Sequence, residues 1–401
     1  MNATALLHNH FINACEDIHA MRLQSVMDVA SALQRSQNLS MAAIGRKIDS
    51  DIKIKNKIKK VDRLESNKHL HKELEDFYSG LSKYVFTYTS HEASTPIIID
   101  LCYLKDNCAV QMLSAEIALK GRSLQLFRDV FNKGELKNRA TQFITNLRNF
   151  VPKSKPVIVI MDAGFGEDWM KAVELAGWYW IVRIRQGRDI KIESNGEWLK
   201  VKDFIPTIGL KSKCYNNAKI MKEHNRECRL ITARKLPQKN RRKPQFTPRN
   251  DMAGNNAYRL SAKEPWILAT NLPIEYKTVQ IINFYKKRMQ IEESFRDLKS
   301  HRFGLSARYI STTCVHRWAV KILLAAIVQV SCWIIGVIGH SQNFQAVFQA
   351  NTVKDKKVFS KTDPEQFAAK QGYFLNLSTS WPIGTAQKRY VVITELVGVE
   401  K

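Results

Sequence analysis

The chain has 401 residues, 44% hydrophobic and 25% charged, so it is globular in composition and long enough for two or three domains. Its charge is unusual: 63 Lys and Arg residues against 37 acids give a formal net charge of +26 and a pI near 9.8. So much positive charge repels itself unless an anionic partner is present. We therefore expect DNA or RNA as the partner, with an acidic membrane surface as the weaker alternative.

The cysteine pattern and the N-terminal residues both indicate a protein of a reducing cytoplasm. The seven cysteines are scattered and form no C-x-x-C pair, which argues against a disulfide scaffold or a zinc ribbon. The first residues lack a basic segment followed by an apolar core, so no signal peptide is expected. Residues 322–338 are almost apolar enough for a membrane span, but the run is short and contains Gln329. We expect it to be a buried helix in a large soluble core.

Residues 1–80 have helical patterning. Asn38-Leu39-Ser40 supplies a cap before a helix over 41–48, and a basic helix over 53–65 follows a polar break. This order is the outline of a helix-turn-helix, whose second helix enters the major groove. Its candidate DNA contacts are Lys57, Lys60 and Arg63. A solvated, Lys-rich helix explains the segment equally well.

The pattern changes near residue 96 to that of an α/β fold. Residues 96–100 form a short apolar, β-branched run that ends on Asp100, and two further strands are expected over 108–119 and 122–131. After a helix over 136–150, the apolar run 156–161 predicts a strand buried on both faces, ending on Asp162.

A helix over 167–176 and a strand over 178–183 complete this part. Strands followed by strand–helix–strand indicate an α/β core with a mixed sheet, beginning at residues 81–186. Residues 187–264 are predicted to be a β-rich insertion, which contains a basic loop at 234–249 with seven cations and no acid.

The second part of the core is expected over 265–340. It starts with a strand at 265–270, and the buried helix at 317–338 ends it. Residues 341–401 form a C-terminal region with a plausible helix at 364–370.

Residues 281–300 contain no Gly or Pro and predict one continuous helix between that strand and the buried helix. At about 100° per residue, four polar side chains fall on one narrow stripe beside an apolar one. They are Tyr285, Arg288, Glu292 and Lys299. This arrangement predicts a site at the rim of the core.

Three acids stand out by position, because Asp100 and Asp162 end buried strands and Glu292 lies on the stripe. Open α/β sheets place their sites at the carboxyl ends of strands. Clustered carboxylates without His or Cys favour Mg²⁺ or Mn²⁺, and paired ions about 4 Å apart promote phosphodiester cleavage. Arg288 and Lys299 would then hold the DNA backbone. Glu293 is the competing candidate for the third acid, but it points away from the stripe.

These residues resemble a known family. Tyr285, Arg288, Glu292 and Lys299 have the spacing of the signature of bacterial cut-and-paste DDE transposases of insertion-sequence family four, which includes the transposon-ten and transposon-five enzymes. Further similar stretches are DAGF at 162–165, GWYWIVRIR at 177–185, SAKEPWILATNLP at 261–273 and FQANTV at 348–353. The resemblance covers most of the chain and is closest to the transposon-ten enzyme. One departure is Leu101-Cys102-Tyr103-Leu104, where close relatives have a second acid and a Trp.

The resemblance implies an RNase H-like catalytic core, an all-helical N-terminal domain that binds DNA ends, and a nucleoid-associated bacterial protein. It implies that Asp100, Asp162 and Glu292 bind two Mg²⁺ or Mn²⁺ ions. It also implies that Tyr285, Arg288 and Lys299 contact DNA phosphates, and that Trp266 stacks on a flipped base. From the sequence alone, the favoured interpretation of Trp266 is an ordinary core aromatic.

The expected function is therefore cut-and-paste transposition of an insertion sequence. Its partners would be the terminal inverted repeats, target DNA and a second copy of the chain in a synaptic complex. The alternative is an inactive DNA-binding relative that acts as a repressor. A host nuclease of the same fold fits less well with the N-terminal domain and Trp266.

Overall fold

The structure is a computed structural model. It describes residues 3–89, 93–105, 109–119, 122–193, 196–234, 264–301, 304–341, 373–376 and 395–398. The chain divides into two compact units. Unit 1 contains residues 1–156 and 289–401, and unit 2 contains residues 157–288. These boundaries differ from those of the five predicted regions, whose functional division remains a prediction.

Six helices precede the first strand of unit 1, in agreement with the helical patterning of residues 1–80. They are α1 (Ala3–Ala14), α2 (Ala20–Ser36), α3 (Met41–Arg46), α4 (Ile54–Glu65), α5 (Lys68–Lys72) and α6 (Leu74–Thr89). Ser40 caps α3 as expected, because its hydroxyl accepts a hydrogen bond from the Ala43 N–H at 3.2 Å. The last helix, α6, continues nine residues beyond the predicted limit.

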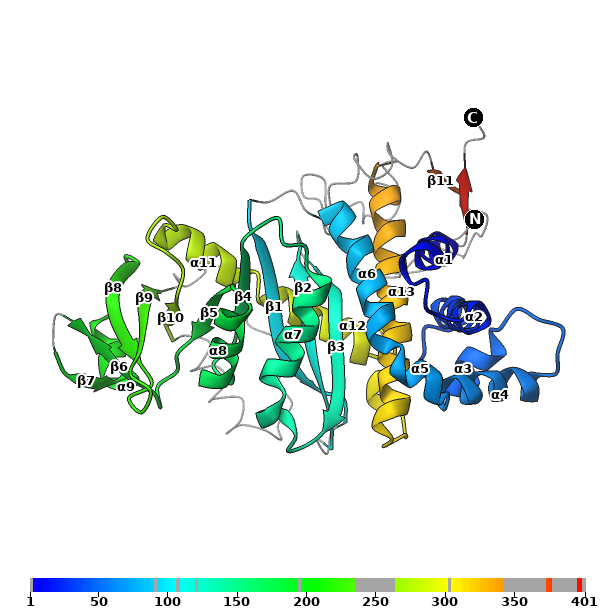
Figure 1. The fold of residues 1–401 in the computed structure, drawn as a ribbon, viewed down its shortest axis with the longest axis horizontal. Coiled ribbons are helices and arrows are strands. Elements are labelled where there is room, and N and C mark those ends of the chain that lie inside the picture. Colours follow the sequence, from blue (N-terminus) through cyan, green and yellow to red (C-terminus); the bar gives the residue numbers. More distant parts are fainter. Residues whose placement is uncertain are drawn as a thin grey trace, which may run out of the picture. The chain divides into compact units, whose positions relative to one another are not determined.

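Helix α13 (Val315–Ser341) forms the centre of unit 1. It contacts α1, α2, α4 and α6 on the helical side and the strand β3 (Ser123–Asn132), and Figure 1 shows α6 and α13 side by side. By length and composition the helix could cross a membrane, but 78% of its most apolar window is buried inside the protein. The apolar run is therefore a core helix, as predicted.

The sheet of unit 1 is an antiparallel meander of β1 (Thr95–Tyr103), β2 (Val110–Ala118) and β3. Helix α12 (Met289–Lys299) packs on all three strands. Helix α7 (Ala140–Phe150) lies on the opposite face, where the rings of Phe127 and Phe143 are 5.0 Å apart. Because both faces are covered, every residue of β2 is buried.

Unit 2 is built on a mixed sheet in the order β4-β5-β10-β9-β8-β6-β7. The strands β4 (Val157–Met161) and β5 (Tyr179–Arg183) are parallel and joined by α8 (Glu167–Leu175). The remaining strands pair antiparallel. They are β6 (Asp189–Ile192), β7 (Trp198–Lys200), β8 (Lys213–Ile220), β9 (Arg226–Ala233) and β10 (Trp266–Thr270). The predicted insertion thus forms strands that extend the sheet through the β9–β10 pair.

Shorter elements complete the units. Helix α9 (Val201–Phe204) belongs to unit 2, and 3-10 turns occupy Leu136–Asn138, Ile205–Thr207 and Ala307–Tyr309. In the C-terminal region, β11 (Tyr373–Asn376) pairs with β12 (Glu395–Gly398). The predicted helix at 364–370, the FQANTV stretch and the basic loop from residue 235 onward lie outside the described residues.

The continuous helix predicted over residues 281–300 is wrong. The structure has two helices, α11 (Thr278–Lys286) and α12, separated at Lys287 and Arg288. The N–H groups of these two residues bond to the carbonyls three residues earlier, both at 3.0 Å, so the α-helical ladder is interrupted. Three consecutive cations meet here, and the two halves bury their apolar faces in different units. Tyr285 therefore lies on α11 and Arg288 in the turn after it, whereas Glu292 and Lys299 lie on α12.

Candidate active site

Asp162 follows the buried strand β4 and lies among cations within unit 2. Its Oδ2 accepts a hydrogen bond from Arg185 Nη2 at 2.8 Å, and its Oδ1 accepts one from the Tyr285 hydroxyl at 3.3 Å. Tyr285 is itself buried on α11. The buried strand β4 and the turn after it therefore fix the position of the Asp162 carboxylate, which is partly exposed and lies beside basic groups.

The charge of Asp162 is stabilised by these neighbours. Burial by itself would raise the pKa of Asp162, but the positive charge of Arg288, the Ala163 N–H and the charges of Arg185 and Arg183 together lower the pKa below its usual value. An ionised carboxylate is the form that binds a metal ion. The opposite shift occurs at the neighbouring phenol, where burial and the charge of Asp162 raise the pKa of Tyr285.

Trp266 lies beside the same group of residues. It begins β10, is half-buried, and its ring makes an edge contact with Tyr285 at 5.1 Å and 76°. The predicted strand at 265–270 is therefore confirmed. Unit 2 thus brings together Asp162, Tyr285, Trp266 and Arg185. Arg185 is a neighbour that sequence reasoning did not single out, although it lies within the GWYWIVRIR stretch.

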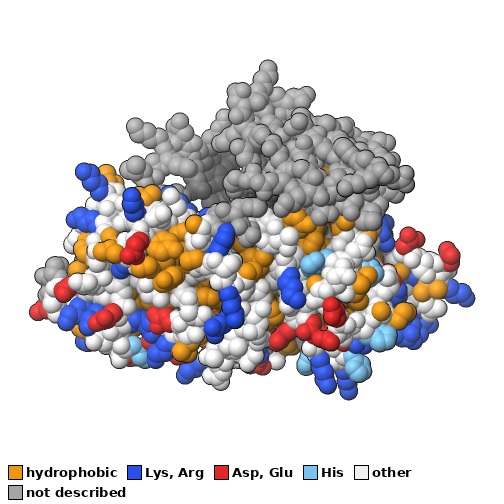
Figure 2. All heavy atoms as spheres, turned by 45° about the horizontal axis from the view of Figure 1, so that its top comes forward, with side chains coloured by type: hydrophobic (Ala, Val, Ile, Leu, Met, Phe, Trp, Pro, Cys, Tyr) orange, Lys and Arg blue, Asp and Glu red, His pale blue; other side chains and the backbone are white. Residues whose placement is uncertain are grey.

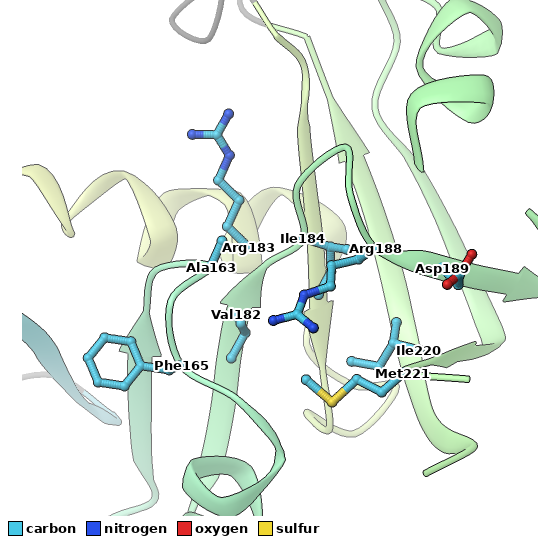
Figure 3. Close-up of a pocket in the computed structure, with 9 residues that line it drawn as sticks. All are labelled: Ala163, Phe165, Val182, Arg183, Ile184, Arg188, Asp189, Ile220 and Met221. Atoms are coloured by element: carbon cyan, nitrogen blue, oxygen red, sulfur yellow. The ribbon is translucent and has the colours of Figure 1, made fainter. Parts of the chain in front are cut away.

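A small pocket opens next to Asp162, lined by Ala163 and Phe165 of the following turn. The end of β5 and the residues Arg188 and Met221 form its other walls. Figure 3 shows the Arg188 side chain reaching across toward Met221, whereas Arg183 projects away. The pocket has room for about one water molecule, which is too little for a nucleotide base.

Asp100 lies within β1 in unit 1, because the strand continues to Tyr103, so the prediction that Asp100 ends its strand is wrong. Its side chain projects toward the face that α12 covers. It stands directly opposite Ser114 of β2, and Ser114 stands opposite Arg128 of β3. Directly opposite residues of antiparallel strands project from the same face of the sheet. Arg128 hydrogen-bonds to Ser294 of α12 at 3.2 Å. Asp100 and the helix that carries Glu292 therefore share one face of this sheet.

The two neighbouring acids of α12 differ in their surroundings. Glu292 is exposed, whereas Glu293 forms ion pairs with Arg122, at 3.5 Å, and with Arg296. Lys299 lies two turns after Glu292 on the same face of α12 and donates a hydrogen bond to the Tyr103 carbonyl at the end of β1, at 3.1 Å. Glu293 is thus engaged in ion pairs at the surface of α12, and the choice of Glu292 as the third acid remains a prediction.

No group of three His, Cys, Asp or Glu side chains in the described part of the chain is close enough to form a metal site by itself. Asp100 and Glu292 belong to unit 1, and Asp162 belongs to unit 2. The metal-binding role of these acids thus remains a prediction. The chemistry of the ligands is suitable, because all three are carboxylates and the pKa of Asp162 is lowered.

The cations of α4 fall into two sets. Lys60 pairs with Asp28 at 2.7 Å, and Lys57 donates to the Ile48 carbonyl at 3.1 Å, so both predicted contacts have partners within unit 1. Arg63 is exposed, as are Lys55 and Lys59 at four-residue spacing before it. In Figure 2 the visible Lys and Arg side chains stand singly or in small groups among acidic and hydrophobic ones. Of the three predicted DNA contacts on α4, Arg63 is thus the exposed one, and contact with DNA remains a prediction.

Gly45 allows α3 and α4 to pack closely, and these helices correspond to the predicted helix-turn-helix. A Cβ at this position would lie 2.7–2.9 Å from Ile58, including its backbone. We expect Gly45→Ala to separate the two helices, lower the urea midpoint of unfolding and weaken DNA binding at least about tenfold. Gly336→Ala is the matched control, because a Cβ there meets nothing within 4 Å and Ala favours a helix by about 1 kcal/mol. Equal behaviour of the two variants in unfolding and gel-shift assays would contradict this packing.

Residues 110–328 match the family described as the Transposase DDE domain. This is more than half of the chain, and the chain belongs to this family. A search of curated proteins gave no match. The family supports a transposase that acts on DNA, and the mixed α/β structure is consistent with an RNase H-like DDE domain. Such domains generally use divalent metal ions. Asp162, Trp266 and Glu292 lie inside the matched range, and Asp100 lies just before it.

Proposed function

We propose that this protein excises an insertion sequence from DNA and joins it to a target by cut-and-paste transposition. The observation that carries the proposal is Asp162: an ionised carboxylate at the end of a buried strand, among arginines, inside a transposase DDE domain. Basic groups around a carboxylate suit a site that holds both a cation and a polyanionic backbone. The net charge of +26 agrees with DNA as the substrate.

Each residue has a role in this proposal. Asp100, Asp162 and Glu292 would hold two Mg²⁺ or Mn²⁺ ions, which supply Lewis-acid activation of the attacking and leaving oxygens when bound. Arg288 and Lys299 hold the phosphates near the cleaved end. Tyr285 donates a hydrogen bond from its hydroxyl to Asp162, so besides any contact with DNA it orients this carboxylate.

Trp266 is the proposed base-stacking residue. Its ring is half-buried and held by its edge contact with Tyr285, which leaves part of its surface for a flipped base. Base–aromatic stacking contributes roughly 1–3 kcal/mol and offsets the few kcal/mol needed to unstack the base. The adjacent pocket beside Ala163 is too small to take this role.

The reaction would be a series of phosphoryl transfers. Water first hydrolyses one phosphodiester at the element end and leaves a 3′-hydroxyl. This hydroxyl attacks the opposite strand and closes a hairpin, which water then opens, and the restored 3′-hydroxyl attacks target DNA. We further propose that two copies of the chain act together in a synaptic complex on the inverted repeats.

The test uses the purified full-length chain and a labelled duplex that carries the inverted repeat flanking its reading frame. We expect nicking and a hairpin product with Mg²⁺ or Mn²⁺, and neither with EDTA or Ca²⁺. Denaturing gels distinguish the hairpin because it migrates at twice the strand length. Specific binding without any cleavage under all metal conditions would contradict the proposal and would instead indicate a DNA-binding repressor.

A further inference from the structure

A fully buried polar network lies between α12 and the sheet of unit 1. Its members come from β2, β3 and α12, and each is at most 4% exposed. They are Ser114, Glu116, Ser123, Gln125, Arg128 and Ser294. The central pair is Arg128 Nη2 and Glu116 Oε1, 3.0 Å apart. Ser114 and Ser123 donate to the two carboxylate oxygens at 2.8 and 2.6 Å.

Ser294 is the contribution of α12 to this network. Its hydroxyl donates to Glu116 Oε1 at 3.0 Å and accepts from Gln125 Nε2 at 2.9 Å and from Arg128 Nη2 at 3.2 Å. A single hydroxyl thus makes three hydrogen bonds to two strands. Only one rotation and one axial position of α12 satisfy all three, because each partner is fixed in the sheet.

The network also includes the residue of β2 that stands opposite Asp100 of β1. Arg128 Nε donates to Ser114 Oγ at 3.1 Å, and Ser114 is the residue directly opposite Asp100. Side chains at such positions have Cβ atoms about 4.5–5.5 Å apart. On α12, Ser294 follows Glu292 by two residues. The network therefore ties the helix that carries Glu292 to the residue that stands opposite Asp100.

Stability alone is a poor explanation for this arrangement. Replacing a buried ion pair with apolar residues is often neutral or stabilising. In addition, Arg128 Nη1 and Gln125 Oε1 are buried without a hydrogen-bond partner among the described residues. Such groups cost about 1–3 kcal/mol each. A network of this kind specifies one arrangement of the parts that it joins.

We propose that Ser294 and the Glu116–Arg128 pair are positioning residues of the active site. They fix the rotation and axial position of α12 on β1–β3, and so hold Glu292 at the place relative to Asp100 that metal binding requires. This inference rests on the proposed function. None of the three residues needs to touch metal or DNA, because they act through Glu292 and Asp100.

The test is Ser294→Ala, with two readouts. The first is the Mg²⁺ concentration for half-maximal nicking, and the second is Mn²⁺ binding to the DNA-free protein, followed by the paramagnetic resonance of free Mn²⁺. We expect both to weaken by about 10–100-fold, the usual effect of losing a group that orients a metal ligand. Nicking at saturating metal should recover most of its rate. Ser294→Thr keeps the hydroxyl and should restore both values.

Ser331→Ala is the matched control. Ser331 is also fully buried in unit 1, but the partner of its hydroxyl among the described residues is the Ile327 carbonyl of its own helix. Gln125→Met is a second variant that keeps the ion pair, removes one bond to Ser294 and also removes the unpaired oxygen. It should fold normally and weaken metal binding a few-fold. It therefore tests the inference even if Ser294→Ala does not fold.

The outcomes separate the two proposals. If the wild-type chain binds Mn²⁺ and nicks DNA, but Ser294→Ala and Gln125→Met match Ser331→Ala in both readouts, the positioning role is wrong and the function stands. Weaker metal binding in the network variants alone supports the positioning role. If the wild-type chain neither binds Mn²⁺ nor nicks its end DNA, the proposed function is wrong, and the inference with it.

Discussion

Asp162→Asn is expected to reduce Mg²⁺-dependent nicking by about a thousandfold or more, since losing even one electrostatic stabiliser of a transition state costs about 10²–10³ in rate. The amide keeps the shape of the side chain but lacks the charge that Arg185 and Arg288 now stabilise. Binding of the same duplex should persist, because Arg185 and Arg288 remain and no longer have the negative charge of Asp162 beside them. Their positive charges therefore stay available to the DNA phosphates. Single-turnover nicking and gel-shift assays at one fixed salt concentration measure the two effects.

Neighbouring acids provide the controls. Asp168→Asn changes an exposed acid in the first turn of α8, six residues away, and should leave nicking unchanged. Asp100→Asn and Glu292→Gln should behave like Asp162→Asn. Glu293→Gln should not, because Glu293 is engaged with Arg122 and Arg296. Substantial Mg²⁺-dependent nicking by any of the three triad variants would refute the assignment of that acid.

Lys321→Met is expected to lower the free energy of unfolding by about 3–5 kcal/mol, the usual cost of breaking a buried ion pair from one side. Lys321 is 2% exposed on α13, and its ammonium bonds to Glu65 of α4 and to the Leu39 carbonyl at 3.0 Å. Without it, Glu65 is a buried carboxylate whose nearest remaining cation is Arg317, at 3.9 Å. Urea unfolding followed by circular dichroism measures the change.

An exposed ion pair gives the control for this effect. Lys60→Met removes the same side chain from its pair with Asp28, where both groups are about one-third exposed, and should cost less than about 1 kcal/mol. The double variant Lys321→Met, Glu65→Leu should recover most of the lost stability, since no charge is left unpaired. Equal urea midpoints for Lys321→Met and Lys60→Met would show that the buried pair contributes no more to stability than the exposed pair does.

Much of the fold followed from local patterns. The apolar runs at 156–161 and 322–338 became β4 and α13, because a segment with no polar face must be buried on all sides. The Ser40 cap and the mixed sheet of the α/β core were predicted for equally local reasons. The break at Lys287 and Arg288 was not predictable, since no Gly or Pro marks it. It arises because α11 and α12 bury different faces in different units.

The candidate site was predicted less completely. Asp162, Tyr285 and Trp266 were named from position and resemblance, and unit 2 brings these three together. Arg185 was missed because its role depends on the turn of the chain after β5. The buried network was missed because Ser114 and Glu116 are polar residues at every second position of their strand. This pattern is typical of a strand face exposed to solvent. Their burial depends on α12, which follows them by more than 170 residues.

The position of α13 in the chain determines when unit 1 can fold during synthesis. Helices α1, α2 and α6 and strand β3 all pack on α13, yet α13 begins only at Val315. Unit 2 is one contiguous stretch that is finished earlier. Domains fold on the ribosome as their residues emerge, so unit 2 can fold while the core of unit 1 still lacks its central helix. A product that terminates before residue 315 would lack α13 and would expose the apolar faces of α1, α2 and α6 that pack on it.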